Sequence, residues 1–439
     1  MNSPLIERIR ADFDASTAQY LHGGASLRPR HDALNAVLSA GLPTTRDEGF
    51  RYTQLRNLEK LKFSVAMPCP DAEAKAAAAL PQRLAGFTRL VFIDGRLSAR
   101  LSDATAGVLD AQPATEATSA ALAPVPAPLP APTPVPAQRR FDLLNAAFAV
   151  APVSLASPAG GKASHIELVF VAVTESAVGA SYPRVLLRAS ANSNVQLVER
   201  HVDAEGATTF TNAVTAIELQ SGAQCAHYRL QSHNHKSVHL ETLSVQVAAR
   251  ARLALHSLHV GAASSRSTVN VALLGEHASA EIYAAHAADG QQVLDTQVTV
   301  EHAARHVSTV EVYRGIAAGR SRVAFNGQML VRESAPGAAT QQSLRALLAG
   351  PDTEADLRPQ LEIYTDDVRA SHGATVGKLD DNMLFYLLSR GIEPATAQSL
   401  LKWAFMADVI NKIDVVPLRR AAQQLVLGQV QGLIGEALA

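Results

Sequence analysis

The sequence predicts a mainly β protein whose core is a parallel β-helix, which we expect to be right-handed, flanked by N-terminal and C-terminal helical regions. Short β-rich segments follow one another between residues 165 and 368. Most gaps between them are too short for a crossover helix, which argues against a doubly wound α/β sheet. A large antiparallel sandwich would need many tight turns, yet the Asn-Gly hairpin pair occurs once, at Asn326-Gly327. The quasi-repeat of similar short units therefore favours a solenoid.

Residues 1–110 are expected to form a helical region that includes a short mixed segment. Within that segment, the run Leu90–Ile93 predicts a strand, and the turn pair Asp94-Gly95 closes it. Earlier apolar residues fall at three- and four-residue spacing in two stripes: Leu5, Ile6 and Ile9, then Leu34, Val37 and Leu38.

Residues 111–139 form an Ala/Pro-rich tract that contains APVPAPLPAPTPVPA. Proline removes amide donors and fixes φ, so we expect an extended, semi-rigid linker or insertion there, without helix or sheet. A ligand for proline-binding domains is the functional alternative, and a tolerated low-complexity spacer is the interpretation we prefer. Ordered sequence restarts at Phe141, and we assign residues 140–370 to the β-helix core.

Several strands expected in this core show clean period-two alternation, as at Val269, Val271 and Leu273, which is typical of strands with one buried face. The expected strands are His165–Val173, Val185–Leu187, Val195–Arg200, Ala216–Leu219, Val238–Val247, Ala251–Val260, Ser267–Leu274, Ala280–Tyr283, Val293–Val300, Val307–Tyr313, Arg322–Val331 and Gln360–Tyr364.

Residues 371–439 are expected to form a C-terminal helical domain. Asp380 can cap its first helix, and Gly391 follows that helix as a stop. Pro394 and Pro417 lie at the starts of a second and a third helix, where the missing proline N–H costs nothing.

Composition argues against several classes of partner. A net charge of −1 gives no electrostatic argument for nucleic acid or for an anionic membrane surface. The two cysteines, Cys69 and Cys225, lack metal-ligand spacing and weakly support a reducing compartment. The N-terminus does not resemble a signal peptide, and no segment has the roughly 20 apolar residues of a membrane helix. We therefore expect a cytoplasmic protein without nucleic-acid or membrane partners.

The P-loop, GxSxG, HExxH and CxxC motifs are all missing from the sequence. Its 15 histidines nevertheless raise the question of a metal site. His233 and His235 would share one face of a strand and could chelate an ion, with His227 and His239 nearby. We prefer the alternative that these are polar exterior positions of a solenoid turn. Two further pairs are interpreted in the same way: His256 with His259, and His302 with His306.

The run PQLEIYTDDVRASHGATVGKLDDNMLFYLLSRGI, at residues 359–392, resembles the characteristic region of the SufB/SufD family of the SUF iron–sulfur cluster assembly system. The resemblance continues through Trp403–Ile413, and Arg46–Thr53 is similar to a further N-terminal element of the family. The N-terminal helical region, and the absence from the C-terminal half of the cysteines expected of a SufB cluster-building subunit, make the chain similar to SufD rather than to SufB. With the β-rich middle, the resemblance covers nearly the whole chain outside the Ala/Pro tract.

The resemblance implies a non-catalytic scaffold subunit, not an enzyme, which pairs with SufB and docks the ABC-type ATPase SufC. A family histidine implicated in nascent-cluster assembly at the SufB–SufD interface corresponds to His372, whereas the family cysteine corresponds to Ala370. Any cluster there must draw its sulfur ligands from the partner. The alternative for His372 is a strand-terminal histidine that bonds the following loop. The resemblance implies no cofactor held stably by this chain alone, allows reduced flavin in the complex, and leaves a homodimer open.

The C-terminal helices offer a candidate docking surface for SufC, since two apolar stripes run along Ser399–Ile413. One stripe can pack on the chain's own domain, whereas a second requires a partner, solvent exposure or burial on two sides. The residues expected to bind the partner are Trp403, Phe405, Met406 and Ile410.

Two other functions stay open at this point. A β-helix carbohydrate-active enzyme would need export, clustered carboxylates and aromatic sugar platforms, which 5% aromatic content and the absent signal peptide disfavour. A SufB-like cluster-building subunit would require Cys225 as a sulfur acceptor, although Cys225 fits better as a small residue in a solenoid layer.

Overall fold

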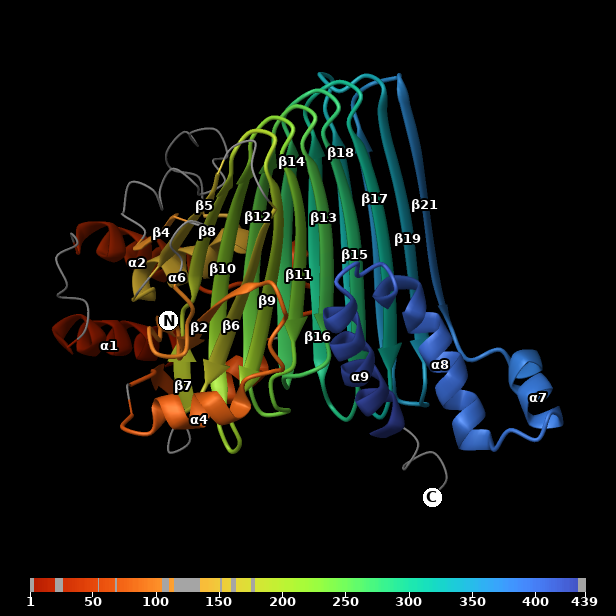
Figure 1. Ribbon diagram of the computed structural model, residues 1–439, viewed down its shortest axis with the longest axis horizontal. Coiled ribbons are helices and arrows are strands. Elements are labelled where there is room, and N and C mark those ends of the chain that lie inside the picture. Colours follow the sequence, from red (N-terminus) through yellow and green to blue (C-terminus); the bar gives the residue numbers. More distant parts are fainter. Residues whose placement is uncertain are drawn as a thin grey trace.

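The computed structural model describes residues 4–19, 27–53, 55–67, 69–104, 110–113, 135–150, 152–158, 163–174 and 178–432. It shows a long parallel β-helix with helices packed along its sides, which confirms the predicted fold class (Figure 1). The helical elements are α1 (Pro4–Gln19), α2 (Arg28–Ala40), η1 (Glu48–Phe50), α3 (Arg56–Lys60), α4 (Ala72–Ala79), α6 (Ala137–Phe148), α7 (Asp381–Ser389), α8 (Pro394–Ile410) and α9 (Val416–Gly432).

The β-helix consists of two sheets, and successive turns add one strand to each. One sheet has the order β20-β18-β16-β14-β12-β10-β8-β5-β4, with β1 and β7 off this path, and the other the order β21-β19-β17-β15-β13-β11-β9-β6-β2-β3. The strands are β1 (Phe63–Val65), β2 (Thr88–Ile93), β3 (Arg96–Leu97), β4 (Asp110–Pro113), β5 (Val153–Ser157), β6 (Ser164–Ala172), β7 (Val178–Ser181), β8 (Arg184–Ala189), β9 (Asn194–Asp203), β10 (Thr209–Leu219), β11 (Gln224–Gln231), β12 (Val238–Val247), β13 (Arg252–His259), β14 (Ser264–Leu273), β15 (Ser279–Ala288), β16 (Val293–His302), β17 (Ser308–Ala317), β18 (Arg322–Val331), β19 (Ala338–Leu348), β20 (Glu354–Ile363) and β21 (Val368–Gly377).

The strand register explains why the sequence repeats only approximately. Val269 pairs with Val298, and Val298 pairs with Gly327, so one turn here takes 29 residues. All pairings along the stack are parallel, and the antiparallel pairs β2–β3 and β4–β5 lie at its N-terminal end. Equivalent positions of successive turns therefore stack directly, and their side chains form columns along the axis.

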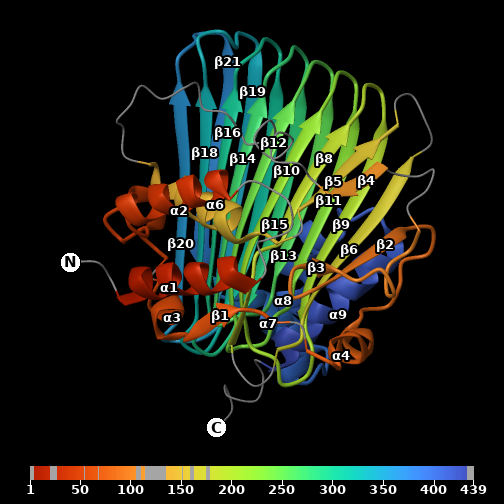
Figure 2. The ribbon, with the colours of Figure 1, turned by 90° about the vertical axis from the view of Figure 1, so that its left-hand side faces the viewer.

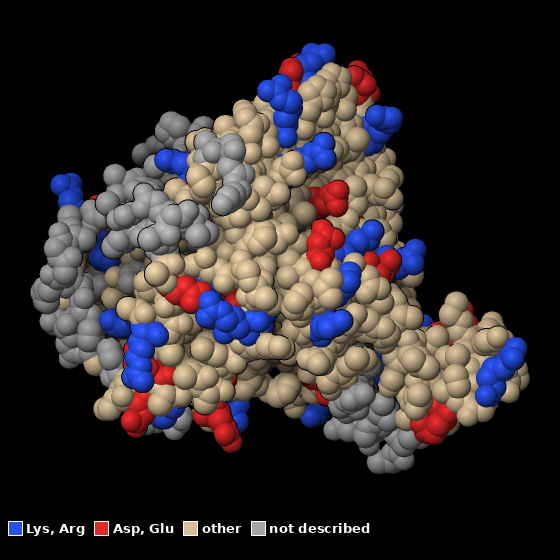
Figure 3. Space-filling view, viewed as in Figure 1, with Lys and Arg blue, Asp and Glu red and all other residues tan. Residues whose placement is uncertain are grey.

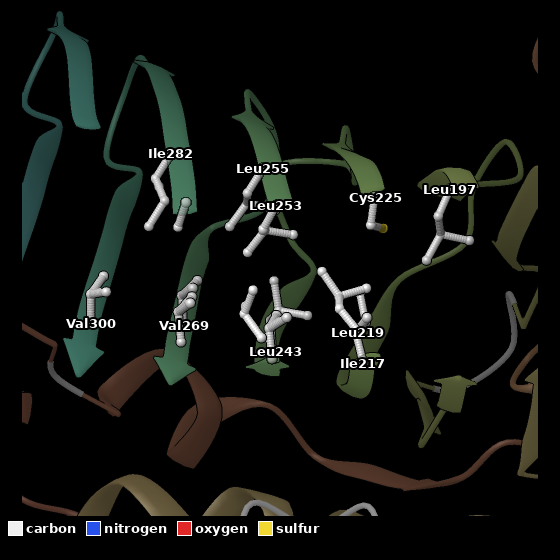
Figure 4. Packing of buried hydrophobic residues seen from close by; sticks show 14 of the residues in the cluster. Leu197, Ile217, Leu219, Cys225, Leu243, Leu253, Leu255, Val269, Ile282 and Val300 are labelled. Carbon is white, nitrogen blue, oxygen red and sulfur yellow. The ribbon is translucent and has the colours of Figure 1, made fainter. Parts of the chain in front are cut away.

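Inward-facing apolar side chains of both sheets form the main core, which Figure 4 shows between facing strands. Alternate residues of each strand point inward, as Leu253 and Leu255 of β13 and Val269 of β14 do. Cys225 is one of these side chains and is only 3% exposed. Its burial raises the pKa of the thiol to about 12. The preferred interpretation of Cys225 as a small core residue is confirmed, and a sulfur-accepting thiolate at this position is disfavoured.

Helices cover the outer faces of the two sheets. In Figure 2, α1, α2 and α6 lie on the side of the sheet that contains β10 and β12, where they share an apolar cluster with both strands. On the other sheet, α8 and α9 pack against β15 and its neighbours. The residues of the predicted N-terminal apolar stripes are buried in α1 and α2, except for Leu38, which is partly buried.

The structure moves the predicted boundaries of the regions. The Ala/Pro tract falls mostly outside the described residues, although Asp110–Pro113 pair as β4 and α6 begins at Ala137. Helix α6 packs with α2 and therefore belongs to the N-terminal helical layer. At the other end, β21 continues to Gly377, so the C-terminal helices begin at Asp381, capped by Asp380 as expected.

The Asn326-Gly327 pair, whose composition is that of a hairpin turn, lies within the expected strand Arg322–Val331, which the structure confirms as β18. A Cβ atom at Gly327 would overlap the carboxylate of Glu311 and lie 2.7 Å from Nε2 of Gln342. Glycine is thus required here because two interior side chains approach the backbone closely, not because the chain turns. Strands β11 and β19 were not predicted at all, since their polar interior residues obscure the alternation.

Within the part of the chain that the structure describes, no helix is both long enough and apolar enough to cross a membrane.

Candidate functional site

The β-helix ends in an open edge at its C-terminal side. β20 and β21 are the terminal strands of the two sheets, and each pairs on one side only, with β18 and β19 respectively. Most residues of β21 are exposed, and none of the ten residues of β20 is buried. Figure 1 shows both the edge strand β21 and the helix α7 at this end of the molecule. Two neighbouring unpaired strand edges form a ready template for main-chain pairing with another chain.

His372 lies in the middle of this edge. It pairs in register with Gln342, which pairs with Glu311, which in turn pairs with Ile282 of the main core. Because these positions stack on one face, His372 continues an inward-facing column and is exposed only because no further turn covers it. Ala370 lies on the same strand and the same face as His372, because β21 continues through both positions.

The open end of the β-helix is otherwise apolar. The inward positions that accompany His372 on β20 and β21 all carry apolar side chains: Ala355, Leu357, Pro359, Leu361, Ile363, Val368, Ala370, Ala374 and Val376. His372 is therefore the only side chain at the inward positions of these two strands that can ligate a metal or move a proton. An imidazole can bind iron or another transition metal, but this end of the chain contributes no thiolate.

The predicted partner-binding residues of α8 separate into two groups. Met406 and Ile410 are 0% and 1% exposed and pack against the chain's own β-helix, so they are not free to meet a partner. The expectation for these two residues is corrected, because their stripe is the one that faces β15 and β17. Trp403 and Phe405 are only partly buried at the margin of the same cluster.

Helix α7 carries the larger exposed apolar surface, which the sequence analysis did not select. None of its residues is buried, and the exposed fraction of Phe385 reaches 72%. It projects from the body in Figure 1, and Figure 3 shows mainly uncharged side chains over this lobe. Met383, Tyr386 and Leu388 are also exposed. A signal was present, since six consecutive residues of this helix, 383–388, are apolar, so that the apolar surface is not confined to one stripe.

Comparison with known proteins identifies the family. The model of the SUF system FeS cluster assembly SufBD core domain matches residues 170–405. The chain is 30% identical over 392 residues to the iron-sulfur cluster assembly protein SufD of Escherichia coli, covering 87% of each chain. The chain belongs to the SufBD family. It is also 28% identical over 409 residues to an iron-sulfur cluster assembly SufBD family protein of Synechocystis, covering 90% of this chain and 89% of the relative.

The chain is thus a SufD-type SUF assembly protein with a role in iron–sulfur cluster assembly. The matched domain spans β6 to α8 and includes both edge strands and His372.

In this SufD-type chain, the N-terminal element Arg46–Thr53 packs on the outer face of the β-helix. Buried Arg266 of β14 lies 3.9 Å from the ring centre of Phe50 and donates a 2.8 Å hydrogen bond to the Thr53 hydroxyl. The same guanidinium donates to the carbonyl of Gly49 and pairs with Asp295. These contacts satisfy a buried charge that would otherwise be costly, so the element fixes the N-terminal layer to the core.

The histidine group of this SufD-type chain is arranged differently from either sequence interpretation. His233 is only 3% exposed, whereas His235 is exposed and does not join it. The structure instead brings His233 together with His201 and His239, with one ring nitrogen of each lying within 4.8 Å of the others. Burial lowers the pKa of His201 and, more strongly, that of His239, so both rings are neutral near pH 7.

The remaining histidine pairs are structural. His256 stacks between Tyr228 and Tyr283, and burial lowers its pKa to about 4. His259 lies on the other face of β13, and its two ring nitrogens bond Ser257 and Ser265. His302, whose pKa burial also lowers to about 4, bonds Thr309, while exposed His306 stacks on His277. Among the described residues, neither pair forms a group that could hold an ion.

Proposed function

We propose that this chain is the non-catalytic SufD-type scaffold of a SufBCD-type complex, in which its open β-helix end pairs with SufB. The observation that carries the proposal is the apolar, uncovered edge formed by β20 and β21. Apolar end turns of a solenoid must be capped or joined to another chain, because each turn buries its core only against its neighbours. A related subunit with a matching end would extend both sheets and bury this surface.

His372 is then the chain's contribution to cluster assembly. Its imidazole lies in the middle of the edge that the partner would cover, surrounded by apolar side chains. The iron–sulfur cluster is the cargo of this site, held transiently between the subunits, and its thiolate ligands come from the partner because Ala370 cannot supply one. The proposal allows reduced flavin in the assembled complex and assigns no stably bound redox cofactor to this chain alone.

The C-terminal helices dock the ATPase SufC. Exposed Phe385 of α7 and half-buried Trp403 and Phe405 of α8 form the apolar part of this surface. Helix α8 is tied to β17 by Arg314, which donates a 3.1 Å hydrogen bond to Asp408. A pull on the helices by SufC would therefore reach strands that lead to the open edge. The absence of a nucleotide-binding motif from the sequence fits a cytoplasmic subunit that responds to ATP hydrolysis elsewhere.

The first test is co-purification of the tagged chain with SufB and SufC, followed by mass determination of the complex. We expect one assembly that contains all three chains. In Ala370→Glu, the introduced carboxylate would be desolvated in an apolar interface, so SufB should be lost. Ala78→Glu, on an exposed position of α4, is the matched control and should co-purify normally. A chain that stays alone, or forms only homodimers, contradicts the proposed pairing.

The cluster site is tested separately by His372→Ala in the reconstituted complex. We expect cluster formation to fall while complex assembly and the unfolding temperature stay unchanged, because His372 is exposed in the isolated chain. Normal cluster formation by this variant would refute the site. For SufC docking, Phe385→Ser should weaken binding, and Leu274→Ser, at a 51% exposed position outside α7, should not.

A further inference from the structure

Three histidines from separate elements converge inside the β-helix, where the chain passes from one sheet to the other. His201 lies near the end of β9, His233 in the loop after β11, and His239 near the start of β12. All three side chains are at least 97% buried. The rings of His201 and His239 have centroids 4.7 Å apart, and those of His233 and His239 5.1 Å apart.

Carboxylates hold two of these rings in a defined orientation. Nδ1 of His233 lies 2.6 Å from Oδ1 of Asp203, and Nε2 of His239 lies 3.0 Å from Oε2 of Glu241. Asp203 also accepts hydrogen bonds from the backbone N–H of Asn234 and from the hydroxyl of Ser237, so its position is fixed by the loop. A carboxylate on one ring nitrogen is the usual outer partner of a metal-binding histidine, because it sets the tautomer and leaves the other nitrogen as an acceptor.

The other ring nitrogens of these histidines have no hydrogen-bond partner. Nε2 of His233, Nδ1 of His239 and both ring nitrogens of His201 are buried without a hydrogen bond. Oε2 of Glu199 lies 3.9 Å from Nε2 of His201, which is too long for a hydrogen bond. Leaving one such polar atom unsatisfied in a core costs about 1–3 kcal/mol, and several converge here. A group that accepts lone pairs from all three rings would remove this cost.

We infer that His201, His233 and His239 form a binding site for a structural divalent transition-metal ion of the Zn²⁺ type. Neutral imidazoles suit first-row metals of borderline softness better than Mg²⁺ or Ca²⁺, which prefer oxygen ligands. Nitrogens bound to one zinc ion at 2.0–2.1 Å lie about 3.3 Å apart, so the present spacing needs only a small inward rotation of the rings. Three imidazoles leave one position of a tetrahedral zinc ion for a further ligand such as water.

The ion would pin the loop of residues 232–237 onto the end of β9. That loop connects β11 of one sheet to β12 of the other, and His235 and Lys236 at its tip are exposed. The site therefore lies beneath this surface loop, and an ion would reach it by way of the loop. The inference concerns this chain alone and does not depend on its pairing with SufB or SufC.

The test uses the full-length chain with its purification tag removed, since a histidine tag binds the same ions. Metal content is measured after purification, and Zn²⁺ is titrated into chelator-treated protein while the unfolding temperature is followed. We expect about one equivalent of metal and a higher unfolding temperature with Zn²⁺. Co²⁺ in place of Zn²⁺ should give a visible spectrum of a nitrogen-ligated ion. Wild-type protein that binds no Zn²⁺ or Co²⁺ overturns the inference.

Variants assign the site within the chain. His233→Gln should reduce the Zn²⁺ affinity by roughly 100-fold or more, and Asp203→Asn by roughly 10- to 100-fold, through loss of the ligand and of its orienting partner. His235→Gln is the matched control, because it changes the same residue type two positions away in the same loop, and its affinity should equal that of wild type. Equal loss in His233→Gln and His235→Gln, or no loss in either, would place the ion elsewhere. The wild-type Co²⁺ spectrum remains informative even where a variant fails to fold.

Discussion

The interior carboxyl of Glu311 predicts a pH-dependent loss of stability that one substitution should remove. Glu311 lies in the column that ends at His372, and its Oε2 accepts a 2.8 Å hydrogen bond from Nε2 of Gln342. Its Oε1 is buried without a partner, and no cationic side chain pairs with it among the described residues. Burial is the main cause that raises the pKa of Glu311 to about 8, against which the Gln342 bond acts weakly.

The sign and size of the effect follow from proton linkage. Below pH 4.5, the ordinary pKa of a glutamate, Glu311 is protonated in both the folded and the unfolded chain, and the folded state carries no penalty. Between that pH and about 8, the unfolded chain releases the proton and the folded chain keeps it, so the free energy of unfolding falls as pH rises. At about 1.4 kcal/mol per pH unit, the total loss is at most roughly 5 kcal/mol.

Glu311→Gln should therefore match wild type near pH 5 and exceed its unfolding temperature increasingly toward pH 8. The assay is thermal unfolding of both proteins, followed by circular dichroism, at half-unit steps of pH. Other titrating groups cancel in the difference between the two proteins. Glu276→Gln, at an exposed position, is the control and should follow wild type throughout. Parallel curves for wild type and Glu311→Gln from pH 5 to 8 would refute the reasoning.

Three further predictions concern packing. Gly327→Ala should destabilise the chain by about 1–3 kcal/mol in chemical denaturation, because the added methyl group overlaps the Glu311 carboxylate. An unchanged denaturation midpoint would argue against that close approach. Met406→Ala should lower the free energy of unfolding by about 2–5 kcal/mol, because Met406 is fully buried against the β-helix. Hydrogen exchange in α8 should increase in this variant. Equal exchange in variant and wild type would mean that the helix docks by other contacts. Arg229→Met should cost about 3–5 kcal/mol, because it removes the guanidinium 2.7 Å from the buried Glu241 carboxylate and leaves only His239 and His259 beside that charge. Recovery of stability in a double variant that also removes Glu241 is the check.

Strand alternation was the feature that the sequence revealed most reliably. In the second half of β14 the inward residues Val269, Val271 and Leu273 are apolar and alternate with outward residues, so they reveal the strand without any knowledge of its neighbours. The same reasoning missed β11 and β19, whose interiors hold polar residues such as Arg229 and Gln342. These residues are tolerated because partners on other turns satisfy their charges and hydrogen bonds, which a single strand cannot show.

The candidate sites likewise include residues that the sequence revealed and residues that it did not. His372 could be selected from the local motif, and its position on β21 required only that the strand continue. Met406 and Ile410 were assigned to a partner because periodicity reveals two apolar stripes on α8 but not which one faces the chain's own sheet. The exposed surface of α7 was overlooked for the opposite reason, since an apolar helix is usually a buried one.

The sequence by itself determined the class of the fold, the flanking helices and the residue expected at the cluster site, because these depend on periodicities and motifs that are local along the chain. Only the tertiary structure decided which distant residues meet. His201, His233 and His239 span 39 residues of sequence yet converge, because each turn of the β-helix stacks on the last and its connecting loops fold back over the same end of the strands. Likewise, the edge at His372 is open only because no further turn follows it, a property of the stack and not of the strand.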